Sequence, residues 1–209
     1  YKILKEQYNI LLDEILEPNM KFLDAGSGIG YFTKFLLSKG VLVDACDISP
    51  NALAILRKNN PKVRTICSSL TNLNEKDKYD AVHCFDVLYH VIDDKEWEAC
   101  IKKFSLISNK YIILHQRFTN RKPMIISNHI KYRSYKEITA LLESLGFKEY
   151  KSIPTHFMAL RLFTYRISKH FPKAFYKLDR SFLNLARKSK SDLINNMGSH
   201  HIKVFKKVL

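Results

Sequence analysis

The sequence predicts an α/β fold in which helices cover both faces of a parallel sheet. Short apolar runs alternate with helical patterns along the chain, and a glycine-rich turn follows the first apolar run. With 209 residues, 46% of them hydrophobic, the chain can bury a sizeable core, which excludes a disordered chain and a disulfide-stapled mini-protein. We therefore expect one domain over residues 1–209.

The elements follow in order from the N-terminus. Apolar residues at helical spacing predict an amphipathic helix over 2–16, and Pro18 ends that pattern. A strand over 21–25 then runs into the glycine turn, and a helix over 31–37 comes after it. The remaining strands are expected over 41–47, 62–67, 79–85, 111–115, 147–153 and 201–208, and the remaining helices over 52–58, over 95–106 and from the capping box Ser134-x-x-Glu137 to Gly146.

The domain divides into four parts. We expect an opening helix within 1–17, a core over 20–153, a helical insertion over 155–199 and a final strand within 200–209. The sequence has no run of about 18 apolar residues and no apolar leader, so the expected location is the cytoplasm.

Charge is distributed unevenly along the chain. The net charge of +15 combines −3 over residues 1–100 with +18 over residues 101–209. A strongly basic half favours contact with something anionic, such as nucleic acid, a phosphorylated metabolite or a membrane surface. The alternative is a solvated, lysine-rich face without a partner.

The four cysteines have no spacing typical of a metal site, so no metal is expected. Three of them lie in predicted strands, where a reduced cysteine usually behaves as a small buried hydrophobe. The cysteines are Cys46, Cys67, Cys84 and Cys100, of which the first three lie in strands.

The motif DAGSGIG over 24–30 lies where a strand turns into a helix. Glycines there let the backbone approach a ligand, and amide groups at the helix N-terminus point at it. The spacing is GxGxG, with Tyr31 where a dinucleotide-binding GxGxxG needs glycine, and no GK[ST] follows. The motif therefore favours a ligand with a nucleoside and an amino-acid part, although a purely structural turn remains open.

A carboxylate ends the second predicted strand. Asp47 comes 17 residues after Gly30, where it can accept hydrogen bonds from both ribose hydroxyls, and Ile48 beside it can cover an adenine face. Taken alone, Asp47 could instead cap the next helix, a role that Ser49 fills equally well.

These segments together resemble the class I S-adenosylmethionine-dependent methyltransferases. The resemblance rests on FLDAGSGIGYFTKFL, VDACDISPNAL, YDAVHCFDVLYHV and HIKYRSYKEITALLESLGF, covers roughly 20–153 and resumes at the final strand. It implies a Rossmann-like sheet of seven strands with the last one antiparallel. It also implies the cofactor S-adenosyl-L-methionine, which leaves as S-adenosyl-L-homocysteine, at the carboxyl ends of the first strands.

The resemblance assigns cofactor binding by position. Residues of the glycine turn would surround the methionine moiety and Asp47 the ribose. Ser69 stands where many relatives have an acidic residue for the adenine amino group, and a hydroxyl is a weaker acceptor there. Phe85, with the backbone around Asp86, would lie beside the sulfonium. The full set is Asp24, Ala25, Gly26, Ser27, Gly28, Gly30, Asp47, Ile48, Ser69, Leu70 and Phe85, with Ile48 and Leu70 flanking the adenine.

Methyl transfer depends mostly on in-line positioning and exclusion of water. A hydroxyl acceptor also benefits from a nearby base, and the candidates at the carboxyl edge are Asp86, His90 and His115. The alternative is that each histidine only bonds a local backbone group.

The insertion 155–199 interleaves aromatic and basic residues. This pattern favours an anionic acceptor that is a small molecule or linked to a lipid, carrier or glycan, methylated on oxygen, with peripheral contact at the inner membrane face. A lid packed on the domain, an RNA or tRNA methyltransferase, and an inactive fold acting as a binding protein are the alternatives. The basic residues include Arg161, Arg166, Lys169, Lys173, Lys177, Arg180, Arg187 and Lys188.

Overall fold

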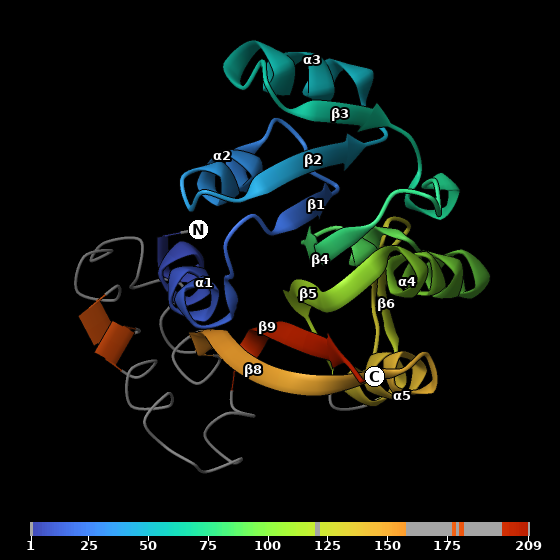
Figure 1. Ribbon diagram of the computed structural model, residues 1–209. Helices are drawn as coiled ribbons and strands as arrows, with labels where there is room; N and C mark the ends of the chain where they lie inside the picture. Colours follow the sequence, from blue (N-terminus) through green and yellow to red (C-terminus); the bar gives the residue numbers. More distant parts are fainter. Residues whose placement is uncertain (1, 120–121, 158–176, 179, 182–197, 209) are drawn as a thin grey trace.

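A computed structural model describes residues 2–119, 122–157, 177–178, 180–181 and 198–208. Its centre is one sheet with the strand order β3-β2-β1-β4-β5-β9-β8 (Figure 1). β9 pairs antiparallel with β5 and with β8, while the remaining pairs are parallel, so the predicted seven-stranded sheet with an antiparallel last strand is confirmed. The strands are β1 (Lys21–Ala25), β2 (Leu42–Asp47), β3 (Arg64–Cys67), β4 (Tyr79–Phe85), β5 (Ser108–Arg117), β8 (Phe147–Phe157) and β9 (Gly198–Lys207).

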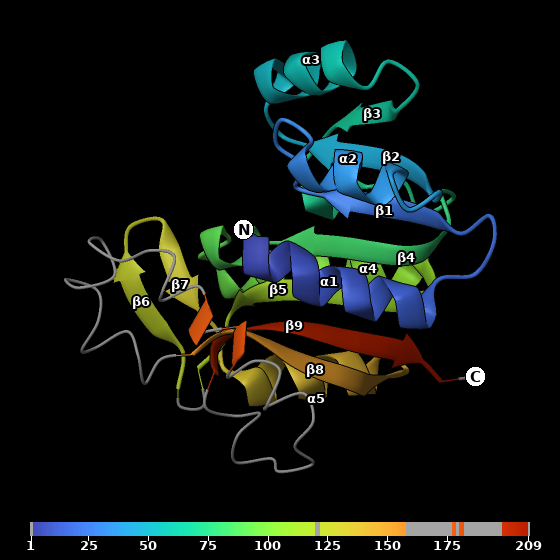
Figure 2. The same ribbon diagram turned by 90° about the vertical axis from the view of Figure 1, so that its left-hand side faces the viewer.

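Helices cover both faces of the sheet, as the alternating pattern predicts. The helices α1 and α2 pack their apolar faces on one side, and α4 and α5 pack theirs on the other (Figures 1 and 2). Each helix buries one stripe of side chains, which is the periodicity visible in the sequence. The helices are α1 (Lys2–Ile15), α2 (Tyr31–Leu37), α3 (Pro50–Asn59), α4 (Asp94–Ile107) and α5 (Tyr135–Ser144).

Side-chain caps fix where three helices begin. Ser49 accepts from the amide of Ala52 at α3, and Asp93 accepts from the amide of Glu96 at α4. At α5 the predicted capping box is confirmed, with Ser134 and Glu137 each bonding the other's backbone amide. Such caps stabilise a helix by about 1 kcal/mol each.

A β-hairpin lies in a segment for which the sequence suggested no element. β6 (Met124–Ser127) pairs antiparallel with β7 (Ile130–Tyr132). The hairpin projects beyond the carboxyl ends of β4 and β5, away from the main sheet (Figure 2). Two short 3₁₀ turns, η1 (Leu70–Asn72) and η2 (Leu88–His90), follow β3 and β4 at the same edge.

Strand β8 is longer than the sequence suggested. We expected it to end at Ile153, before Pro154, but it continues to Phe157. Proline is tolerated because β8 is an edge strand and its register shifts between Pro154 and His156, where no ladder amide is required. Most of the expected insertion 155–199 lies outside the described residues, so its helical character stays a prediction.

Three of the cysteines are buried and one is not. Cys46, Cys84 and Cys100 lie in the core, whereas Cys67 is exposed, contrary to expectation. Cys67 is the last residue of β3, which forms the other edge of the sheet and is only partly covered. Within the described ranges, none of the helices has the length and apolar character needed to cross a bilayer.

Candidate functional site

The glycine turn packs tightly on the segment that follows β4. The amides of Gly26 and Ser27 both donate to the Cys46 carbonyl, at 2.8 and 2.9 Å, which ties the turn to β2. Gly26 has φ +81°, and a Cβ there would lie 2.3 Å from Cγ2 of Val87. Glycine is therefore required at this position both by backbone conformation and by space.

Above Gly28 the turn is open. Its φ is +54°, yet a Cβ there would meet no atom within 4 Å. The neighbouring Ser27 hydroxyl is buried and has no hydrogen-bond partner among the described residues. A buried hydroxyl usually has a partner. An open cradle beside an orphaned hydroxyl fits a polar ligand.

Asp47 ties this turn to the start of α3. Its Oδ2 accepts from the amide of Gly28 and its Oδ1 from the amide of Ser49, both at 2.8 Å. Since Ser49 itself caps α3, the capping alternative does not account for Asp47. Each carboxylate oxygen retains a second lone pair for a ligand. Ile48 beside it is 73% exposed, so its side chain is accessible to a ligand.

Asp24 lies beneath the turn. Its Oδ2 accepts from the Thr33 hydroxyl at 2.6 Å, and its Oδ1 lies 3.0 Å from Nδ1 of His83. With only 2% of its surface exposed, Asp24 supports the turn from below, which differs from the expected position around the methionine moiety. Ala25 beside it is fully buried.

Three further predicted residues have engaged or buried side chains. Ser69 pairs its hydroxyl with that of Thr71 at 2.9 Å, and Leu70 packs into the core. The Phe85 ring lies among other rings, 3.8 Å from that of His83, and is 6% exposed. We expected the Phe85 ring beside the sulfonium and Leu70 against the adenine. In the structure both side chains instead fill the core, because β4 and η1 turn them inward.

His115 is also buried, which makes it a supporting residue. Thr155 donates its one proton to the His200 carbonyl, so its oxygen accepts from Nε2 of His115 at 3.0 Å. Nδ1 of His115 lies 3.1 Å from Oδ1 of Asp86, at an angle outside hydrogen-bond geometry. Asp86 adopts φ +58°, and its amide donates to the His115 carbonyl at 2.8 Å. The pair thus joins the ends of β4 and β5, and only Asp86 reaches the surface.

His90 stands out at the carboxyl edge because its tautomer is fixed and its ring is exposed. Nδ1 lies 2.9 Å from the backbone carbonyl of His129. A carbonyl only accepts, so Nδ1 carries the proton and Nε2 keeps its lone pair. None of the described contacts involves Nε2. The local backbone bond that we weighed as an alternative therefore exists, and it leaves the other nitrogen ready to accept a proton.

The β6–β7 hairpin forms a wall beside His90. Tyr132 of β7 packs edge-on against Tyr89, with ring centroids 5.9 Å apart. On β6 the three consecutive apolar residues Met124, Ile125 and Ile126 are 43%, 66% and 48% exposed. Arg117 lies over the Tyr132 ring at 5.2 Å. The hairpin surface beside His90 thus combines exposed apolar side chains with positive charge.

Burial makes the Cys46 thiol unreactive. The pKa of Cys46, whose carbonyl anchors the glycine turn, is raised to about 12, chiefly because burial removes the water that would stabilise a thiolate. Nor do three or more His, Cys, Asp or Glu side chains of the described residues gather where they could hold a metal ion.

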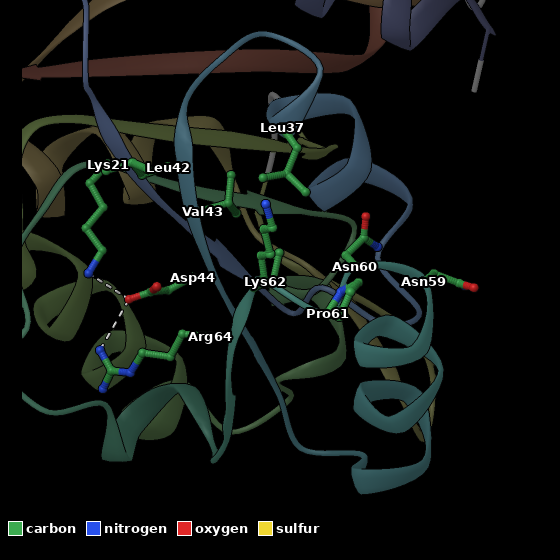
Figure 3. A pocket seen from close by; sticks show the side chains of 11 residues that line it. Lys21, Leu37, Leu42, Val43, Asp44, Asn59, Asn60, Pro61, Lys62 and Arg64 are labelled. Atoms are coloured by element: carbon green, nitrogen blue, oxygen red, sulfur yellow. Dashed lines mark hydrogen bonds and ion pairs between the residues drawn. The ribbon is translucent and has the colours of Figure 1, made fainter.

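A separate cavity of about 630 Å³ lies at the amino ends of the strands, opposite the carboxyl ends where the glycine turn lies (Figure 3). It opens where β1, β2 and β3 begin, whereas the glycine turn follows the end of β1. Asp44 in its wall accepts ion pairs from Lys21 at 2.8 Å and Arg64 at 3.2 Å. These charges are paired with one another, so the cavity lacks the unpaired polar groups found at the carboxyl ends of the strands.

Comparisons with known proteins agree with this geometry. Residues 22–108 match a family model described as a methyltransferase domain. Ubiquinone biosynthesis O-methyltransferases of two Rickettsia bellii strains are 32% identical over 98 residues, which cover 45% of this chain and 38% of theirs. The chain thus spans well under half the length of these curated relatives.

Solved structures show the fold over nearly the whole chain. Magnesium protoporphyrin IX methyltransferase from Synechocystis PCC 6803, solved with S-adenosylmethionine bound, has a TM-score of 0.64 at 18% identity, covering 99% of this chain and 78% of that one. An S-adenosylmethionine-dependent methyltransferase from Clostridium acetobutylicum ATCC 824 has a TM-score of 0.67 at 14% identity, covering 99% and 92%. At such identities the similarity shows the fold.

Sequence reasoning missed several residues that shape the site. His83 and Thr33 hold Asp24, Val87 covers Gly26, and His129 holds His90. A polar residue in an otherwise apolar strand was the available signal for His83. The contact with His129 had no sequence signal, because a backbone carbonyl makes it.

Proposed function

The chain carries a class I methyltransferase domain, and we propose that it transfers a methyl group from S-adenosylmethionine to a hydroxyl of an anionic acceptor with an apolar part. The single observation that carries this proposal is His90, whose protonated Nδ1 is held by a carbonyl while Nε2 remains free to accept a proton. A positioned base of this kind is what a hydroxyl acceptor needs.

The glycine turn and the end of β2 would hold the cofactor. The cradle at Gly28 and the orphaned hydroxyl of Ser27 fit its amino-acid part, and Asp47 with Ile48 fits its nucleoside. When bound, S-adenosylmethionine supplies a methyl group already activated on a sulfonium. The residues of the chain then have two tasks, to align the acceptor and to remove its proton.

The short path from Gly26 through Val87 to His90 supports a role for His90 near the glycine turn. Val87 packs on Gly26, and η2 advances from Val87 to His90 by about 6 Å at 2.0 Å per residue. Nε2 of His90 would accept the hydroxyl proton as the new oxygen–carbon bond forms and the methyl–sulfur bond breaks, with its electron pair left on sulfur. General base catalysis contributes roughly 10²–10⁴-fold to the rate.

Two features support the class of acceptor. The exposed Met124–Ile126 run beside His90 offers apolar contact area, and contiguous exposed apolar side chains usually mark a binding surface. The net charge of +18 over residues 101–209 attracts anions. A lipid- or carrier-linked substrate meets both conditions. The same charge supports an RNA acceptor as the second candidate.

The experiment uses the full chain, labelled S-adenosylmethionine and extract of the source cells, separated into lipid, glycan, small-molecule and nucleic-acid fractions. We expect label in a fraction containing lipid, glycan or small molecules. Label in RNA, weakened steeply by salt, would establish the second candidate. Failure to bind S-adenosylhomocysteine in calorimetry would establish an inactive fold.

Two variants test the role of His90. His90→Asn keeps a donor where Nδ1 lies and removes the base, whereas His90→Ala removes both. We expect both to lower turnover at least about 100-fold and to leave S-adenosylhomocysteine affinity unchanged. Near-normal turnover of His90→Asn would show that His90 is structural. Asp13→Asn, on the exposed face of α1, is the control.

A further inference from the structure

We propose that Arg133 is a positioning residue for His90, a role that rests on the proposed function. Arg133 directly follows β7 and is 2% exposed, among the most buried large side chains described. A guanidinium is rarely buried unless its donors are satisfied. The partners of Arg133 therefore show what it holds in place.

One nitrogen of Arg133, Nη2, faces the segment immediately after His90, while Nη1 lies 3.4 Å from the carbonyl of Lys131. Nη2 lies 3.1 Å from the carbonyl of Val91, 3.0 Å from that of Ile92 and 3.4 Å from that of Asp93. These three carbonyls belong to the link between η2 and α4. The two N–H groups of Nη2 are thus shared among the carbonyls of the whole link.

Charge and packing fix the guanidinium itself. Oδ1 of Asp94 lies 2.8 Å from Nη2, and the Trp97 ring lies 5.1 Å from the guanidinium carbon. Burial lowers the pKa of Arg133, while Asp94 raises it. Arginine remains charged under these conditions, so the carbonyls face a permanent cation.

The hairpin therefore holds residues 90–93 at two points. At its turn, the His129 carbonyl accepts from Nδ1 of His90, and at its far end Arg133 binds the three carbonyls that follow. His129 lies between β6 and β7 and Arg133 directly follows β7, so the same hairpin contacts both η2 and the link that follows it. Without the Arg133 contacts, residues 91–93 can shift. The His90 ring then loses its hydrogen bond to the His129 carbonyl, and the direction of Nε2 is no longer fixed.

Lysine cannot replace this function. Its ammonium ends a flexible four-carbon stem, whereas the planar guanidinium lies against the Trp97 ring, which fixes the direction of Nη2. We expect Arg133→Lys and Arg133→Met each to lower the rate of a single methyl-transfer turnover about 10–100-fold, as misplacement of a reacting group by about 1 Å does. S-adenosylhomocysteine affinity should stay within about twofold, because that site lies at the glycine turn.

The decisive readouts are the imidazole ¹⁵N shifts of His90 and a double-variant cycle, measured on the full chain. In the wild type the shifts should show the Nδ1–H tautomer, and in both Arg133 variants a mixture of tautomers. In a His90→Asn background, loss of Arg133 should cause little further loss of turnover. Lys102→Met, on the exposed face of α4, is the control.

Two results would overturn the proposal: an unchanged His90 tautomer in both variants, or an equal loss of turnover in the His90→Asn background. Arg133→Lys keeps a cation in the buried site, so this variant provides the test if Arg133→Met does not fold. If His90→Asn is itself fully active, the proposed base is wrong, whereas the ¹⁵N shifts still decide whether Arg133 orders the ring.

Discussion

Nδ1 of His83 lies 3.0 Å from Oδ1 of Asp24, and neither side chain is more than 2% exposed. The two residues are register partners on β4 and β1. Rings surround the pair, with Tyr8 stacked on His83 at 5.1 Å. A polar contact in the middle of an aromatic cluster thus joins the strand that precedes the glycine turn to the strand that precedes η2.

Replacing His83 by Phe should destabilise the protein by about 1–3 kcal/mol, because a buried acceptor of Asp24 loses its partner. Urea denaturation measures the free energy of unfolding. Tyr8→Phe is the matched control: the Tyr8 hydroxyl is buried without a described partner, so its removal should leave stability unchanged or slightly higher. Equal losses in the two variants would contradict this account.

Two glycines of the turn should respond differently to alanine. Gly26→Ala forces a Cβ against Val87 and should lower both stability and S-adenosylhomocysteine affinity, with partial recovery in a Gly26→Ala/Val87→Ala double variant. Gly28→Ala meets no protein atom, so its stability loss should be limited to about 1–2 kcal/mol for the left-handed backbone. Its affinity should still fall, because the Cβ enters the cradle. Calorimetry of both variants checks this, and normal affinity of Gly28→Ala would place the ligand elsewhere.

The cysteines should separate by reactivity. Burial raises the pKa of Cys46 to about 12 and that of Cys100 to about 11, so at pH 8 both remain protonated thiols. Cys67 is exposed. We expect a thiol reagent to modify Cys67 alone in the folded protein and all four cysteines in urea, as mass spectrometry can count. Modification of Cys46 before Cys67 would contradict the buried position of Cys46 in β2.

Stability should fall in acid. Arg64 lowers the pKa of Asp77, and Lys131 lowers that of Asp94. A carboxylate whose folded pKa is depressed stabilises the fold above its unfolded pKa, and this contribution is lost as pH falls through the folded value. The free energy of unfolding should therefore decrease below about pH 4. Asp77→Asn should make this decrease less steep. If the free energy of unfolding of the variant falls as steeply with pH as that of the wild type, other groups cause the decrease.

Patterns of apolar residues were sufficient to predict most of the sheet and helices. β1, β2 and β4 bury both faces, so they appear in the sequence as short apolar runs between turn residues. The β6–β7 hairpin escaped prediction because its apolar residues are exposed and carry no burial pattern. Pro154 concealed the end of β8, since only the register shift shows that no amide is needed there.

The candidate site was predictable where it depends on backbone conformation. Glycines at positive φ and a carboxylate at the end of β2 are local features that spacing reveals. The direction of a side chain is not local. Asp24, Phe85 and His115 were placed at the correct edge of the sheet, yet their side chains point into the core because of what packs against them.

The position of β9 has a consequence for synthesis of the chain. Among the strands that the structure describes, β8 pairs only with β9, which follows it after about 40 residues. At about 5–20 residues per second, a nascent chain therefore spends several seconds with β5 and β8 complete but without the strand that pairs with both. During this interval two strand edges are open to intermolecular pairing. Slower translation of the segment before β9 would lengthen the exposure, and a ribosome-associated chaperone would shield it.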